Sequence, residues 1–312
     1  MSWRIVFMGT PAFACPSLRA LLARRDPVVG VVCQPDRPQG RGLAVTAPPV
    51  KTLALAHGVP VLQPTKVRDA AFLESLRALA PDLVVVAAYG RILPRPVLDL
   101  PPHGCINVHA SLLPRHRGAA PIAHAILAGD AVTGVCIMAM AEEMDAGDVL
   151  LRRETPIRPD DTTGGLTERL AALGADALSD AIDGLQGGTL VAVPQPAEGV
   201  TFAPKLERAQ ARLDWTRDAA ALERLVRAMQ PEPIAFTTLD GRALRVFRAA
   251  ADPAPAAAEP GVVVAGGRDE LVVATGAGTL RLLEMQAEGK RRLHAAAFLA
   301  GRRIPPGTRL GP

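Results

Sequence analysis

An asparagine, a histidine and an aspartate are the side chains of this sequence best suited to chemistry. Asn107 and His109 stand two residues apart in the otherwise apolar stretch 104–109, which predicts a short buried strand. Side chains two apart on a strand project from the same face, and burying a polar pair is costly unless it has a task or a partner. With the turn-prone residues 111–114 that follow, this stretch predicts a reaction site at the carboxyl end of a sheet.

Asp145 is the third candidate, in an acid-rich stretch that follows a further predicted strand, 134–140. If this strand pairs with the one that carries His109, Asp145 would orient the imidazole and raise its pKa. An isolated acidic loop is more often solvated, and Asp145 or Asp148 could equally be a cap. Taken together, the three side chains suit acyl transfer: the amide donates to a developing oxyanion, the imidazole polarises the carbonyl or moves a proton, and the carboxylate holds the imidazole.

Other chemistries have less support in the sequence. None of Ser111, Cys105 and Cys136 lies in the context of a nucleophile elbow, so direct transfer is favoured over a covalent intermediate. The histidines near residue 109 have no metal-ligand spacing, and we expect no metal. Residues 9–11 follow a strand but lack the spacing of a dinucleotide fingerprint or a P-loop, which predicts a tight turn and no nucleotide cofactor.

The elements that must position these residues alternate between strands and helices, and this pattern predicts an α/β fold with a doubly wound, mostly parallel, Rossmann-like sheet. Residues 34–49 are rich in proline and glycine and predict a long irregular loop. Strands are predicted at residues 5–8, 28–33, 61–62, 83–88, 104–108, 134–140 and 149–157, and helices at 12–23, 50–57, 70–79, 120–128 and 162–185, the last capped by Asp160 or Asp161.

The composition and the predicted secondary structure change after residue 190. A proline-containing stretch without a clear pattern predicts a linker at 191–206, and a catalytic domain at 1–190 precedes it. Residues 207–312 begin with a helix at 218–229 and continue in five short strands, which predicts a small C-terminal β-barrel of the OB type. Residues 249–260, rich in alanine and proline, predict a flexible barrel loop.

Length and composition fit two ordinary globular domains: the chain has 312 residues, of which 49% are hydrophobic and 21% charged. Aromatic residues make up only 3%, which leaves little for stacking on single-stranded nucleic acid. The four cysteines form no CxxC pair and are expected to be reduced. With no membrane-length apolar run and no signal peptide, we expect a cytoplasmic monomer without membrane contact.

Positive charge is concentrated in the second part of the chain. Residues 1–200 carry 18 Lys/Arg and 19 Asp/Glu, a net charge of −1, whereas residues 201–312 carry 17 and 12, a net charge of +5. A basic domain beside a neutral one indicates a polyanionic partner. An arginine-rich surface without any such partner explains the charge about equally well.

Several separate stretches resemble the 10-formyltetrahydrofolate-dependent formyltransferase family, and together they extend over nearly the whole chain. The central match is Asn-Val-His-Ala-Ser-Leu-Leu-Pro at 107–114, followed by Asp-Ala-Gly-Asp at 145–148. The others are at residues 7–11, 34–38, 40–42, 87–90, 92–94, 117–118, 121 and 213–215.

The resemblance implies an enzyme that moves a formyl group from 10-formyltetrahydrofolate, its co-substrate, to the free amine of methionine esterified to initiator tRNA. It implies that Asn107, His109 and Asp145 are the catalytic residues. It further implies two sets of binding residues. The folate set is Ser111, Leu112, Leu113 and Pro114, with Tyr89, Gly90 and residues 138–142 enclosing the pterin; the tRNA set is Arg37, Arg41 and Lys205, with the C-terminal domain gripping the tRNA.

The sequence departs from the family's pattern in two segments, and two other functions are alternatives. Leu43 and Ala44 stand where the family often carries lysines, and Glu232 stands where it often has tryptophan. An N-formyltransferase for amino-sugar nucleotides would need neither a basic second domain nor the Gly-Arg-Gly loop at 40–42. A non-catalytic folate- or tRNA-binding module would not need the Asn/His/Asp set.

Overall fold

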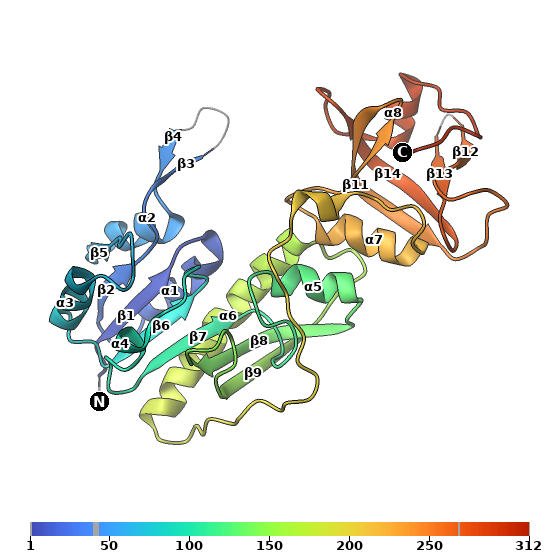
Figure 1. Cartoon of the computed structure of the whole chain (residues 1–312). Helices are drawn as coiled ribbons and strands as arrows, with labels where there is room; N and C mark the ends of the chain where they lie inside the picture. Colours follow the sequence, from blue (N-terminus) through green and yellow to red (C-terminus); the bar gives the residue numbers. More distant parts are fainter. Residues whose placement is uncertain (1, 40–43, 268, 312) are drawn as a thin grey trace. The chain divides into compact units, whose positions relative to one another are not determined.

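The structure is a computed structural model of the chain, and it describes residues 2–39, 44–267 and 269–311. The chain forms two compact units (Figure 1). Unit 1 consists of Met1–Pro121, Val132–Pro156 and Thr167–Pro204, and unit 2 of Ile122–Ala131, Ile157–Leu166 and Lys205–Pro312.

Unit 1 is built on a seven-stranded sheet with the order β5-β2-β1-β6-β7-β8-β9. The first five of these strands run parallel, and β8 and β9 are antiparallel to their neighbours. Every residue of β1 and β6 is buried, as expected for central parallel strands covered on both faces. The strands are β1 (Ile5–Gly9), β2 (Val28–Val32), β5 (Val61–Leu62), β6 (Leu83–Ala87), β7 (Cys105–His109), β8 (Val132–Ala139) and β9 (Val149–Pro156). The predicted α/β fold with a mostly parallel sheet is confirmed.

Helix α6 (Thr163–Gln186) packs against one face of β7 and β8 and leaves the other face to the candidate site. A Cβ added at Gly174 of α6 would lie 2.8 Å from Val108 Cγ1 and 3.5 Å from Val135 Cγ1, so the helix lies directly on these side chains. The other helices of unit 1 are η1 (Ala12–Ala14), α1 (Cys15–Leu22), α2 (Pro49–Ala56), α3 (Ala70–Ala78) and α4 (Arg95–Leu98), whereas α5 (Pro121–Ala128) lies almost entirely in unit 2.

The start of α6 differs from the sequence prediction. The N–H of Gly165 donates to the hydroxyl of Thr162 at 3.3 Å, whereas the carboxylate of Asp161 accepts from the N–H of Arg158 at 2.7 Å. The hydroxyl of Thr162 therefore accepts a hydrogen bond from the first turn of the helix, and the prediction of Asp160 or Asp161 as its cap was wrong. Asp161 closes the preceding turn instead, a use for which aspartate is well suited.

The prediction that residues 34–49 form an irregular loop throughout was wrong. Strands β3 (Arg37–Gln39) and β4 (Ala44–Thr46) pair antiparallel within this segment, with Pro38 opposite Val45. A proline lacks an N–H donor, but a two-stranded ribbon has no second neighbour that needs one. Arg41 lies outside the described residues, so its contribution to this arm stays a prediction.

Unit 2 contains a second, antiparallel sheet with the order β10-β11-β14-β13-β12, and β15 pairs with β14. The strands are β10 (Phe236–Leu239), β11 (Arg242–Asp252), β12 (Val263–Gly266), β13 (Leu271–Ala274), β14 (Thr279–Ala287) and β15 (Leu293–His294), accompanied by η2 (Arg208–Ala211), α7 (Ala219–Ala228) and α8 (Ala295–Ala300). The predicted small β domain is confirmed. The predicted barrel loop at 249–260 starts too early, because β11 pairs with β14 as far as Asp252.

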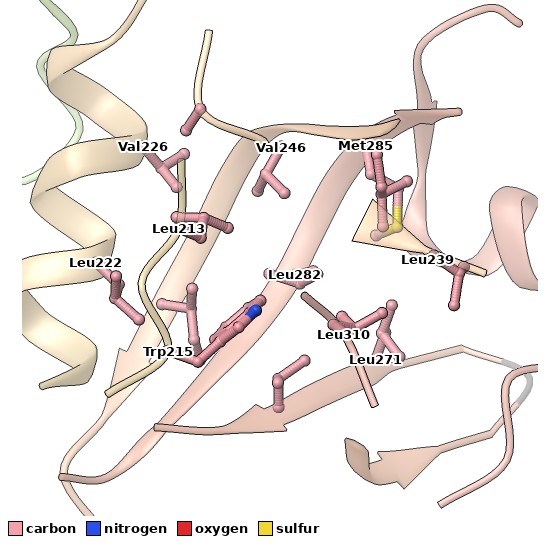
Figure 2. Close-up of a cluster of buried hydrophobic side chains, with 14 of the residues drawn as sticks. Leu213, Trp215, Leu222, Val226, Leu239, Val246, Leu271, Leu282, Met285 and Leu310 are labelled. Atoms are coloured by element: carbon pink, nitrogen blue, oxygen red, sulfur yellow. The ribbon is translucent and has the colours of Figure 1, made fainter. Parts of the chain in front are cut away.

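The core of unit 2 lies between its sheet and helix α7 (Figure 2). Trp215 is the largest side chain of this core, and its indole N–H donates to the hydroxyl of Thr237 at 3.1 Å, which satisfies a donor that would be costly to bury alone. Around it gather Leu213, Leu222, Val226, Leu239, Val246, Leu271, Leu282, Met285 and Leu310.

Candidate active site

Strand β7 presents Asn107 and His109 on one face of the sheet in unit 1. The strand is regular over Cys105–His109 and pairs with β6 on one side and β8 on the other, so these two side chains lie on the face opposite Val108 and α6. Asn107 is half-buried, and His109 is 5% exposed. The geometry therefore agrees with the expectation that both side chains share one face near the carboxyl end of β7.

The imidazole of His109 is held between two acceptor groups. Its Nε2 lies 3.1 Å from the main-chain carbonyl oxygen of His116, and because a carbonyl can only accept, Nε2 carries the proton. Its Nδ1 faces the Oδ2 of Asp145 at 3.6 Å, longer than a hydrogen bond. A neutral His109 thus directs the lone pair of Nδ1 toward a carboxylate, and a proton taken up at Nδ1 would be shared with Asp145.

Burial lowers the pKa of His109 below its ordinary value, and the charge of Asp145 opposes this shift. Desolvation is the larger influence because the ring is almost completely covered, and it penalises the charged form. His109 is therefore neutral near pH 7, the state in which an imidazole can accept a proton.

Asp145 reaches His109 because the loop after β8 turns back along the sheet. In the β7–β8 pairing Cys136 lies opposite His109, whereas Ala139, at the end of β8, lies opposite Ile106. Continued strand pairing would leave the residues after Ala139 at least four positions away from His109. The return is fixed by a hydrogen bond from the N–H of Ala139 to the carbonyl of Asp148 at 2.8 Å.

The carboxylate of Asp145 is anchored from a second side. Its Oδ2 accepts the main-chain N–H of Gly118 at 2.8 Å, so the loop after residue 114 and the loop after β8 are joined at this atom. The side chain of Asp145 is 15% exposed. The structure thus brings the three predicted catalytic residues together in unit 1.

Of the three residues, Asn107 is the one whose side chain has no hydrogen-bond partner among the described residues. In the described part of the chain its amide makes no side-chain hydrogen bond. Beside it on β8 lies Met138, and this methionine packs with Leu113, Cys136 and Val149 in a buried apolar cluster. The site therefore combines a free amide donor with an apolar wall.

The turn at residues 111–114 folds over this wall. Ser111 is buried, and its hydroxyl donates to the carbonyl of Arg115 at 2.6 Å. The N–H of Leu113 donates to Cys136 Sγ at 3.4 Å. Leu112 and Pro114 are half-buried, and Leu112 packs against Gly134, where an added Cβ would lie 2.6 Å from Leu112 Cδ2. Four of the six residues predicted to bind folate, Ser111, Leu112, Leu113 and Pro114, thus belong to one turn on the site's face.

Tyr89 and Gly90 follow the neighbouring strand β6 and lie in a different environment. The ring of Tyr89 is 2% exposed within the apolar core, and burial raises the pKa of its hydroxyl to about 12. Its carbonyl accepts from Thr10 Oγ1 at 3.2 Å and from Gln34 Nε2 at 3.0 Å. Gly90 has a φ of +77°, and the main chain rather than the Tyr89 ring is what this loop can offer to a ligand.

The residues predicted to bind tRNA are exposed where the structure describes them. Arg37, on β3, donates from Nη2 to Gln34 Oε1 at 2.7 Å and is otherwise open to solvent. Lys205 is exposed at the start of the long C-terminal part of unit 2.

Sequence reasoning missed the residues that support the site from the segment at 191–204, which we name the strap. Gln195 and Thr201 of the strap make hydrogen bonds to the loops that carry Asp145 and His116. One available signal was the Pro-Gln-Pro sequence at 194–196: a residue before proline is restricted to extended conformations, so its side chain has a fixed starting direction.

Neither a metal site nor a membrane span emerges from the described residues. No group of three or more His, Cys, Asp or Glu side chains is arranged there to hold a metal ion. Over the same part of the chain, no helix has both the length and the apolarity required to cross a bilayer.

Comparison with known proteins identifies the family. Residues 3–182 match the model of the formyl transferase family, and residues 205–303 match the model of the formyl transferase C-terminal domain. The chain belongs to the formyl transferase family. It is thus a formyl-transferring enzyme of the family expected from the sequence.

Relatives and solved structures agree with this membership. The methionyl-tRNA formyltransferase of Myxococcus xanthus is 55% identical over 98% of this chain and 97% of its own length. That of Stenotrophomonas maltophilia is 54% identical over 96% and 98%. An N-formyltransferase from Helicobacter canadensis, solved with folinic acid and dTDP-3-aminofucose, has a TM-score of 0.68 at 14% identity over 92% of this chain and 100% of its own, which shows a shared fold.

Proposed function

We propose that this formyl transferase moves the formyl group of 10-formyltetrahydrofolate to the free amino group of methionine esterified to initiator tRNA, a reaction of translation initiation. The observation that carries the proposal is the joining of Asn107, His109 and Asp145 on one face of β7, in a chain that matches methionyl-tRNA formyltransferases over nearly its whole length. A pure binding module would have no use for this set.

The turn at 111–114, which rests on the buried apolar wall, is suited to pack against a flat heteroaromatic ring such as a pterin. Leu112 and Pro114 are half-buried and can offer apolar atoms to the ring, the buried cluster of Leu113, Cys136, Met138 and Val149 supports them from behind, and main-chain groups near Gly90 supply polar contacts. Sites of this kind are mostly apolar, with a few placed polar groups that orient the ligand. The formyl carbon would then lie beside the free amide of Asn107.

Asn107 is the residue suited to stabilise charge on the formyl oxygen. When the amine attacks the formyl carbon, the new C–N bond forms and electrons of the C=O bond move to oxygen. A preorganised donor that faces this oxygen lowers the barrier because it needs no reorganisation at the moment of reaction. The amide of Asn107 has no competing bond among the described residues, so it is available for this contact.

His109 and Asp145 are suited to move the proton. The attacking amine must lose one proton, and the departing N10 of the folate must gain one, so a group that accepts and then donates completes the reaction. Nδ1 of neutral His109 is the accepting atom, because Nε2–H is directed at the His116 carbonyl. Asp145, 3.6 Å away, stabilises the imidazolium, whose charge also favours the oxyanion.

The acceptor is assigned to tRNA from charge and from the relatives. Residues 201–312 carry a net charge of +5, and Arg242, Arg245 and Arg248 of β11 are exposed. A phosphate backbone is bound by such cations. Arg37, Arg41 and Lys205 complete the proposed tRNA contacts, and a monomer in the cytoplasm is the proposed working form.

Two acceptors distinguish the proposal from its nearest alternative. Purified chain is assayed with 10-formyltetrahydrofolate and either methionyl initiator tRNA or an amino-sugar nucleotide, with uncharged tRNA as control. We expect formyl transfer to the charged tRNA only. Turnover on the sugar nucleotide and none on the tRNA would refute the assigned acceptor. The variant Asn107→Ala should lower kcat by about 10²- to 10³-fold, as the loss of one oxyanion donor does elsewhere.

A further inference from the structure

The strap connects the two stretches matched by the family models, yet it is tied to the loops of the candidate site. Val193 exchanges main-chain hydrogen bonds of 2.8 and 2.9 Å with Val149 of β9. Further along, the N–H of Ala203 donates to the carbonyl of Arg117 at 2.7 Å, and the N–H of Arg117 donates to the carbonyl of Thr201 at 2.9 Å. The strap is thus a part of unit 1 with fixed register.

Gln195 of the strap is hydrogen-bonded through its complete amide. Its Nε2 donates to the carbonyl of Asp145 at 2.8 Å and to that of Gly147 at 2.7 Å. Its Oε1 accepts from Arg117 Nε at 3.1 Å and from Arg117 Nη2 at 2.8 Å. An amide has two donor hydrogens and two acceptor lone pairs, so all four are used.

The loop that Gln195 holds has an unfavourable backbone. Asp145 has a φ of +52°, a left-handed conformation that is unfavourable for a residue with a Cβ. At Gly147 a Cβ would lie 1.9 Å from the carbonyl oxygen of Ala139, so the turn is also very tight. Such a conformation persists only where surrounding contacts determine it, and Gln195 bonds the carbonyls of both residues.

Thr201 holds the group on the other side of His109. Its Oγ1 accepts the N–H of His116 at 2.8 Å, and the carbonyl of His116 accepts the proton of His109 Nε2. His116 itself has a φ of +60°. The strap therefore restrains both neighbours of the imidazole, Asp145 through Gln195 and His116 through Thr201.

We propose that Gln195 and Thr201 are positioning residues of the active site, which hold Asp145 and the His116 carbonyl against the two nitrogens of His109. The catalytic role that this inference gives to the two residues rests on the proposed function. Neither residue needs to contact a substrate: each acts by fixing a main-chain group beside His109, and misplacing such a group by about 1 Å can cost about 10²-fold in rate.

The test compares Gln195→Met with Gln230→Met in the full-length chain. Gln230 is a matched control, since its Nε2 also donates to two carbonyls, those of Val226 at 3.0 Å and Phe247 at 2.7 Å, within unit 2. Three quantities are measured for each variant: the kcat and KM of formyl transfer to methionyl initiator tRNA, the pKa of His109 by NMR titration of ring resonances, and the Tm.

In Gln195→Met we expect kcat to fall about 10- to 100-fold below that of Gln230→Met, with both KM values within about twofold of the parent chain. The pKa of His109 should fall further, because Asp145 no longer stays close enough to favour the charged form. A kcat equal to that of Gln230→Met together with an unchanged pKa of His109 would overturn the proposal.

Thr201 provides a second test with its own rescue. Thr201→Val keeps the shape but loses the acceptor for the His116 N–H, whereas Thr201→Ser keeps the hydroxyl. We expect a reduced kcat in the valine variant and recovery in the serine variant; equal loss in both would contradict a role of the hydroxyl. If the parent chain transfers no formyl group at all, the proposed function fails, and the NMR titration still decides the positioning by Gln195.

Discussion

His109 shows how a single residue acquires its properties from its surroundings. Exposed on a helix or loop, an imidazole would titrate near its ordinary pKa of about 6.5. Here the ring is covered, Nε2–H is directed at a carbonyl and Nδ1 faces a carboxylate. Burial favours the neutral form, and Asp145 stabilises the proton once it arrives, which is the behaviour required of a group that accepts a proton and returns it.

Asp145→Asn tests the charge of this residue separately from its structural contact. The asparagine can still accept the N–H of Gly118 through its side-chain oxygen, so the loop should keep its conformation. Without the negative charge the imidazolium is less stable, and we expect kcat to fall about 10²-fold or more. Steady-state kinetics and Tm are measured beside Asp180→Asn, whose partner Arg153 lies in a half-exposed ion pair. Equal kcat values for the two variants would remove Asp145 from the mechanism.

The lowered pKa of His109 also predicts how stability depends on pH. The unfolded chain takes up a proton on this histidine near pH 6.5, whereas the folded chain takes it up only at lower pH. Below pH 6.5 the unfolded state therefore binds more protons than the folded state. As the pH is lowered through this range, the free energy of unfolding of unit 1 decreases, and His109 contributes at most about 1.4 kcal/mol per pH unit to this decrease.

Urea unfolding of the parent chain and of His109→Gln between pH 7.5 and 5.5 measures this contribution. We expect the variant to lose less stability than the parent chain over this range, because glutamine does not titrate. A steeper loss in the variant would show that the folded state favours, rather than disfavours, the charged imidazole.

At the scale of elements, the site depends on three segments that are distant in the sequence. Strand β7 supplies Asn107 and His109, the loop after β8 supplies Asp145, and the strap holds that loop in place. The pairing of β7 with β8 is necessary but not sufficient, because its register alone leaves the end of β8 opposite Ile106. The turn back and the hydrogen bonds from the strap provide the rest.

Helix α7 of unit 2 offers a test of how local sequence fixes an element. Asp218 precedes the helix, and its Oδ1 accepts the N–H of Ala221 at 2.6 Å. Removing such an N-cap costs about 1 kcal/mol. We expect Asp218→Ala to lower the free energy of unfolding of unit 2 by about this amount and Asp218→Asn to lower it by less, measured by urea unfolding followed through Trp215 fluorescence. A stable alanine variant would show that packing of the apolar face of α7 makes the cap dispensable.

At the scale of the whole molecule, positive charge is distributed unevenly along the chain. The first 200 residues, which hold Asn107, His109 and Asp145, are nearly neutral, whereas residues 201–312 carry a net charge of +5. A folate and a tRNA differ greatly in charge, so their binding should respond differently to salt. This difference can be measured on the intact chain.

Affinity for tRNA should fall steeply with salt, because each phosphate neutralised by Lys or Arg releases counterions, with a slope of log K against log salt of about −0.9 per phosphate. We expect a slope of about −3 or steeper for the parent chain, and a shallower one when Arg242, Arg245 and Arg248 are replaced by glutamine. Filter binding between 50 and 200 mM salt gives these slopes, and folate affinity, measured by tryptophan fluorescence, should change little. A flat response of tRNA binding would rule out the C-terminal residues as a tRNA-binding surface.

Local patterns in the sequence were enough to predict most elements. The apolar run at 83–88 predicted a strand covered on both faces, which the structure has at Leu83–Ala87, and the alternation of strands and helices then predicts the α/β sheet. The errors fall where context overrides local preference. The prolines of residues 34–49, Pro38 among them, favoured a loop over a strand, but in a ribbon of two strands the missing N–H of Pro38 costs nothing. Thr162 rather than Asp161 caps α6, because the carboxylate of Asp161 accepts a hydrogen bond in the preceding turn.

The sequence by itself predicted a set of residues suited to acyl transfer and determined that two of them share a face: alternation along a strand already places Asn107 and His109 on one face, because the period of a strand does not depend on the rest of the fold. Only the tertiary structure decided that Asp145 reaches His109, that Nε2 of His109 carries the proton, and that Gln195 and Thr201 hold both neighbours of the ring. These facts depend on hydrogen bonds between segments up to 85 residues apart, such as that from His116 to Thr201. No local pattern encodes such a bond, because its energy exists only when the whole of unit 1 has folded.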